Sequence, residues 1–180
     1  MRRNIRFVTR TALLLAVAIL FQYLGKYMGT YNNFIVGPIV NAVLLIATEI
    51  VGIFSGIFIS VAAPLVSALT NKAAIAPVIL AFSPFIMAGN AIYAVIYALL
   101  NKRKTISSGI LAVVAASILK FGFLFGSVLA FTRFMNINEK VAGVLIGLFS
   151  WPQLVTALIG GAVAALIICP ALKRVLNDQN

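Results

Sequence analysis

The chain has 180 residues, of which 63% are hydrophobic and only 9% are charged, and its mean hydropathy is +1.12. This composition excludes a soluble globular domain, because too few polar residues are present to cover its surface. Fourteen basic residues face three acidic ones, which gives a formal net charge of +11. The bases form short clusters between apolar runs, as orientation signals do in membrane proteins, and this argues against a nucleic-acid partner.

The first expected transmembrane helix covers residues 7–25. It follows an arginine-rich start that contains Arg2, Arg3, Arg6 and Arg10. No small-x-small cleavage pattern closes the apolar run, so we interpret it as a retained span rather than a signal peptide. A polar and aromatic loop is expected over residues 26–33.

The apolar stretch that starts at residue 34 is too long for one span. A single helix over residues 34–69 would measure about 54 Å, far more than the hydrocarbon core of about 30 Å. One span here would also place Lys102, Arg103 and Lys104 outside, against the positive-inside rule. The sequence therefore predicts two short spans, 34–51 and 53–70, with a turn near Gly52.

Three further spans are predicted, at 77–100, 106–131 and 151–172. Residues 141–149 form an apolar piece too short to cross, which is either a re-entrant turn or an early start to the last helix. Nine bases then lie inside, four outside, and Lys120 lies within a span. The expected fold is an all-α integral membrane protein, a six-transmembrane-helix bundle in one domain over residues 1–180, with cytoplasmic N- and C-termini.

Residues that could carry catalysis are scarce. The chain has no histidine, one cysteine (Cys169) and three acids. Metal sites of the His/Cys type and internal disulfides are therefore excluded. Few side chains are available to act as a general acid or base. We expect neither an enzyme nor an ATP-driven pump, and no cofactor in this chain.

Lys120 is the most informative residue, because it interrupts a run that is otherwise long and apolar enough to span the membrane. A charge at that depth costs about 2.5–3.5 kcal/mol on insertion scales and normally faces a cavity or the protein interior. Lys120 lies about 21 Å along the helix from Ile106, in the outer half of the bilayer. One alternative is that its side chain snorkels to the outer interface.

Other polar and aromatic residues are expected near the same level, where they would complete a ligand pocket open to the outside. This candidate set consists of Asn41, Ser83, Asn90, Trp151, Gln153 and the loop residues Tyr31, Asn32 and Asn33. Alternatives remain open for some of them, since Trp151 could be an interfacial belt residue and Asn41 and Asn90 could bridge helices, which is the favoured reading for Asn90. Glu49 is expected to mark a helix end or a partner contact.

Two local sequences give the chain a family resemblance. Residues 11–16 contain Ala12 and Ala16 in an Ala-xxx-Ala arrangement in the first span, and residues 37–42 read Gly-Pro-Ile-Val-Asn-Ala. Together with the length, the span count and the basic N-terminus, they resemble a substrate-binding S component of an energy-coupling-factor (ECF) vitamin transporter. The resemblance covers nearly the whole chain.

The resemblance implies a function in the uptake of a small water-soluble vitamin or vitamin precursor across the bacterial plasma membrane. Ala12 and Ala16 would dock on a transmembrane coupling subunit, while two cytoplasmic ATPases, absent from this chain, would use ATP. The S component would topple in the membrane to carry its ligand inward. Lys120 favours a ligand with a carboxylate or an acidic, electron-rich ring.

Two other functions stay open at the level of the sequence. A small non-catalytic structural or assembly membrane protein would need no pocket and would leave Lys120 snorkelling. A channel-forming oligomer would require a polar stripe along several helices, whereas the chain offers only isolated polar residues.

Overall fold

A computed structural model describes residues 2–28, 32–70, 75–103 and 105–177. Every regular element within these ranges is helical. In chain order the elements are α1 (Arg2–Gly25), α2 (Asn32–Ile46), the π-helix η2 (Ala47–Val51), α3 (Ile53–Leu69), α4 (Ala76–Leu100), the 3-10 turn η3 (Asn101–Arg103), α5 (Ile106–Phe134), α6 (Glu139–Phe149), α7 (Trp151–Ala162), the π-helix η4 (Val163–Ile168) and α8 (Cys169–Asn177).

Five continuous helical segments are long and apolar enough to cross a membrane: Asn4–Gly25, Asn32–Val51, Ala76–Arg103, Ile106–Phe134 and Glu139–Val175. The helix Ile53–Leu69 is equally apolar in character but shorter. Large hydrophobic side chains are exposed on most of these helices, which a soluble protein would not tolerate over such an area. The chain is therefore a multi-pass helical membrane protein.

The predicted division of the long apolar stretch is confirmed at Gly52. This residue has φ 135°, a backbone conformation that favours glycine, and it separates η2 from α3. Glu49 lies in η2, in the last turn before this break, as expected for a residue near a helix end.

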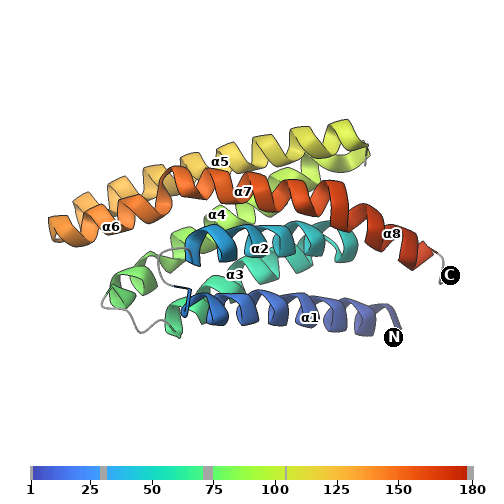
Figure 1. The fold of residues 1–180 in the computed structure, drawn as a ribbon, viewed down its shortest axis with the longest axis horizontal. Helices are drawn as coiled ribbons and strands as arrows, with labels where there is room; N and C mark the ends of the chain where they lie inside the picture. Colours follow the sequence, from blue (N-terminus) through green and yellow to red (C-terminus); the bar gives the residue numbers. More distant parts are fainter. Residues whose placement is uncertain (1, 29–31, 71–74, 104, 178–180) are drawn as a thin grey trace.

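Some helices extend beyond the predicted spans. α2 begins at Asn32, so Asn32 and Asn33 lie in its first turn rather than in a loop, and α5 continues to Phe134. Residues 141–149 fall in α6, which a hydrogen bond from the Lys140 N–H to Asn138 Oδ1 caps at 3.0 Å. Since α6 and α7 follow one another along nearly one line, the early-start interpretation of this segment fits the structure (Figure 1).

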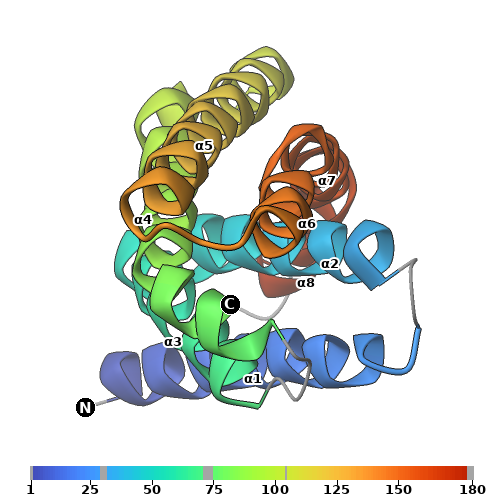
Figure 2. The ribbon, with the colours of Figure 1, turned by 90° about the vertical axis from the view of Figure 1, so that its left-hand side faces the viewer.

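The arrangement places α2 at the centre of the bundle. Figure 2 shows α2 between α1 on one side and α7 on the other, with α4 beside it, while α5 packs against α4 and α7. The described ends of the chain, at the start of α1 and the end of α8, lie at the same end of the bundle (Figure 1). The end of α1 and the start of α2 lie at the opposite end of the bundle.

Close contact between α2 and α7 depends on Gly160. A Cβ atom placed there would lie 2.2 Å from the Pro38 carbonyl oxygen and 2.9 Å from the Asn41 Cβ. Any larger residue would therefore push the two helices apart. This contact also fixes the height and direction of Asn41.

We expect Gly160→Ala to destabilise the protein by about 1–3 kcal/mol, because backbone atoms of α2 cannot move away as a flexible side chain would. The measurement is the melting temperature of the purified protein in detergent. Gly143→Ala is the matched control, since no described residue lies within 4 Å of a Cβ at that position. Equal melting temperatures for the two variants would contradict the proposed role of Gly160.

Candidate ligand-binding site

A cavity of about 260 Å³ lies in the half of the bundle away from the described chain ends. Its walls come from the end of α1, the start of α2, the end of α3, α4, α5 and the junction of α6 with α7. Val36, Ile79, Ile86 and Phe149 contribute apolar surface. The polar groups come from one amine, six side-chain amides and one hydroxyl: Lys120, Gln22, Asn32, Asn33, Asn41, Asn90, Gln153 and Ser67.

Lys120 is directed into the bundle. Its side chain is only 3% exposed, and its ammonium donates a hydrogen bond to Asn41 Oδ1 at 2.6 Å. The same nitrogen lies 5.2 Å from the centre of the Tyr93 ring, within range for a cation–π interaction. A snorkelling side chain would instead reach the bundle surface, so this geometry supports the pocket interpretation.

Both partners of Lys120 are held rigidly. The Tyr93 hydroxyl donates to the Ala157 carbonyl oxygen at 2.7 Å, which anchors the ring to α7. Asn41 is fixed by the close contact of α2 with Gly160. The Lys120 ammonium extends from α5, and residues of α2 and α4 therefore hold it in a defined position.

The structure brings together five of the other candidates, since Asn32, Asn33, Asn41, Asn90 and Gln153 all line the cavity with Lys120. Asn90 thus faces the cavity, although the sequence favoured a helix-bridging role. Gln153 also donates from Nε2 to the Leu148 carbonyl oxygen at 3.5 Å, the limit for a hydrogen bond.

Two candidates lie elsewhere. Trp151 is 59% exposed and its ring lies 5.6 Å from that of Phe34, an arrangement that suits an interfacial belt residue. The Ser83 hydroxyl donates to the Leu80 carbonyl oxygen at 2.7 Å, within its own helix. Tyr31 lies outside the described residues.

Sequence reasoning missed Gln22 and Ser67. Gln22 is an amide near the end of the first span, and its Oε1 atom is buried without a hydrogen-bond partner among the described residues. A buried acceptor of this kind costs free energy until a donor reaches it. Its place within three residues of the end of α1, at the same level as Asn32, was a signal that could have revealed it.

The cavity has a cation without a carboxylate counterpart among the described residues. Of the three acids, Glu49 accepts hydrogen bonds from Tyr97 and Asn101 and forms a salt bridge with Lys173. Glu139 begins α6 on the surface, and Asp178 lies outside the described residues. Lys120 is therefore paired with a neutral amide and can still donate two N–H bonds.

Ala12 and Ala16 lie on an exposed face of α1. The opposite face packs inward, where Ala18 is fully buried and Thr11 Oγ1 lies 2.8 Å from Ser55 Oγ in a hydrogen bond to α3. The two alanines therefore contribute little to packing within this chain. Their small side chains leave a shallow surface on which another helix can approach closely.

These features define a helical membrane protein that encloses a small polar cavity, with one buried cation and several amides. The sequence matches the family model described as "ECF transporter, substrate-specific component" over residues 6–172. The chain belongs to this family. Comparison with curated proteins and with solved structures found no significant match.

Membership identifies the chain as the substrate-binding subunit of an uptake system. Substrate-specific components bind a small molecule and work with a separate ECF module, and they are not enzymes. The chain is accordingly a multi-pass membrane protein whose partners are a substrate and that module.

Proposed function

We propose that this protein captures a small water-soluble vitamin or vitamin precursor that carries a carboxylate or another acidic group. The observation that supports this proposal is the buried Lys120 ammonium, which has a neutral partner and no carboxylate within the described cavity. A buried charge without a counter-charge is costly, and an anionic ligand group would remove that cost. Two N–H donors remain for such a group.

The amides around the ammonium favour a ligand with both donors and acceptors. Asn32, Asn33, Asn90 and Gln153 each offer a carbonyl oxygen and an NH₂ group, while Gln22 presents an acceptor that no described residue satisfies. The cavity volume of about 260 Å³ lies just below the range of about 300–1,000 Å³ common for ligand pockets, so a compact ligand is favoured.

The proposed topology has six spans, with α3 as the shortest, and both termini in the bacterial cytoplasm. The bases near the described termini and in η3 lie at one end of the bundle, which supports this orientation through the positive-inside rule. The cavity then lies in the outer half of the membrane. Delivery would follow when the protein topples against the coupling subunit, driven by ATP hydrolysis in two partner ATPases.

A thermal-shift screen tests the ligand class. The purified protein is heated with a panel of water-soluble vitamins and precursors, and we expect one acidic member to raise the melting temperature strongly. The amide or ester derivative of that compound is the matched control, and it should stabilise far less because it lacks the negative charge. A screen in which only cationic or neutral compounds stabilise the protein would contradict the proposal.

Gln22→Met provides a second test of the same cavity. The substitution keeps the length of the side chain but removes its hydrogen-bonding amide. We expect the affinity for the ligand found in the screen to fall about 5- to 50-fold, the loss that corresponds to about 1–2.3 kcal/mol for one buried hydrogen bond. Isothermal titration measures it, and unchanged affinity would remove Gln22 from the site.

A further inference from the structure

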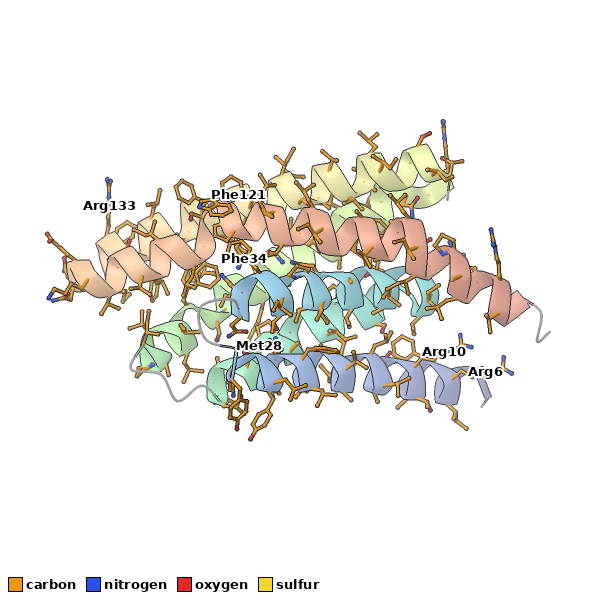
Figure 3. The ribbon with its side chains drawn as sticks, in the orientation of Figure 1. Arg6, Arg10, Met28, Phe34, Phe121 and Arg133 are labelled. Atoms are coloured by element: carbon orange, nitrogen blue, oxygen red, sulfur yellow. The ribbon has the colours of Figure 1, made fainter. Side chains whose placement is uncertain are left out.

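A second cavity lies at the opposite end of the bundle, beside the start of α1. It has a volume of about 390 Å³ and is enclosed by the first turns of α1 and by the break between η2 and α3. Asn4, Arg6 and Arg10 form its polar side, and Phe7, Val51 and Phe54 are among its apolar residues. Figure 3 shows that Arg6 and Arg10 leave α1 near the N-terminus, with both side chains directed to the side of α8.

The charge in this groove is not balanced by the described part of the chain. The only salt bridge there joins Lys173 to Glu49, and Glu49 also accepts the Tyr97 hydroxyl. Arg6 and Arg10 are one helical turn apart, so both guanidinium groups can approach one anionic group of a bound ligand. Arginine binds phosphate with paired N–H donors, and two arginines in one groove fit a phosphate ester well.

An exposed apolar stripe begins in the same groove. Phe54, which is 76% exposed, lines the cavity, and it is followed along one side of α3 by further exposed hydrophobic residues at steps of three or four. These residues are Phe58, Val61, Leu65 and Leu69. The stripe runs from the groove along the length of α3, so an elongated apolar chain could follow it away from the arginines.

We propose that this groove binds one molecule of an anionic phospholipid. The phosphate contacts Arg6 and Arg10, and an acyl chain lies along Phe54 and the exposed side of α3. Charge complementarity supports the headgroup assignment, and the apolar stripe distinguishes a lipid from a soluble phosphate. The site is separate from the cavity that Lys120 lines. It places a lipid against α1, the helix that also carries Ala12 and Ala16.

Native mass spectrometry of the full-length protein in a neutral detergent tests this proposal. The protein is incubated with equal amounts of dioleoylphosphatidylglycerol and dioleoylphosphatidylcholine, and the bound lipids are counted. We expect one phosphatidylglycerol molecule to be retained with at least a tenfold preference. The double variant R6Q/R10Q should reduce that preference to about twofold or less.

K102Q/R103Q is the matched control, because it removes the same charge from exposed positions in η3 and should keep the tenfold preference. Circular dichroism checks that R6Q/R10Q remains helical. Phe54→Asn, at a position that is 76% exposed, should weaken lipid retention about threefold. Equal loss in both double variants would overturn the proposal in favour of diffuse attraction to basic residues. Displacement of the lipid by 20 mM inorganic phosphate would overturn it in favour of a soluble ligand.

Discussion

Replacement of Lys120 by methionine should abolish high-affinity substrate binding. Methionine keeps an unbranched apolar stem, one atom shorter than lysine, but removes the ammonium that faces the cavity. Loss of one partner from a buried, hydrogen-bonded charge pair costs about 2–5 kcal/mol, which corresponds to roughly 30- to 5,000-fold in affinity. Binding is measured by titration of the purified variant with the vitamin found in the screen.

Two further variants show whether loss of the positive charge causes the loss of affinity in Lys120→Met. Lys120→Gln can still donate to Asn41 Oδ1 but carries no charge, so it should lose affinity almost as strongly as Lys120→Met. Lys140→Met removes an exposed lysine at the start of α6 and should bind like the wild type. Wild-type affinity in Lys120→Gln would contradict an ionic contact and leave Lys120 a structural role.

Ala16→Leu should reduce uptake by cells to background while leaving substrate binding within about twofold of wild type. Ala16 lies on the exposed face of α1 and does not line the cavity, so a larger side chain there obstructs a partner helix without reaching the ligand. The two readouts are transport of the labelled compound found in the screen, by cells that express the complete transporter, and binding of that compound by the purified subunit. Ala12→Leu should behave in the same way.

Ala88→Leu is the matched control for these variants. Ala88 is also an exposed alanine, but it lies on α4 rather than on α1. It should leave both uptake and binding unchanged. Parallel loss of binding and uptake in Ala16→Leu would show instead that Ala16 contributes to internal packing.

The sequence was informative about the fold because membrane spans depend mainly on length, hydrophobicity and the placement of basic residues. The long apolar stretch after residue 34 required a break, and Gly52 was available to make it. Boundaries were less predictable because polar residues can continue a helix beyond the hydrocarbon core. Asn32, Asn33 and Arg133 were assigned to loops for that reason, although all three are helical.

The candidate site was predictable for those residues whose depth in the membrane was enough to place them near Lys120. Lys120, Asn41 and Gln153 were placed together from their height in the membrane. Ser83 and Trp151 have a suitable height but point in other directions, since rotation about the helix axis depends on packing that one sequence does not reveal. Gln22 was missed for the opposite reason, because its direction is correct and its position within an apolar run hid it.

The buried ammonium of Lys120 also has an electrical consequence. In the proposed toppling motion, this charge moves through part of the transmembrane potential, where a full crossing is worth about 2.3 kcal/mol per 100 mV. A monocarboxylate ligand would make the inward step electroneutral. The ligand-free protein would return with its positive charge against a potential that is negative inside, so membrane voltage would slow the return step and leave the loaded step unaffected.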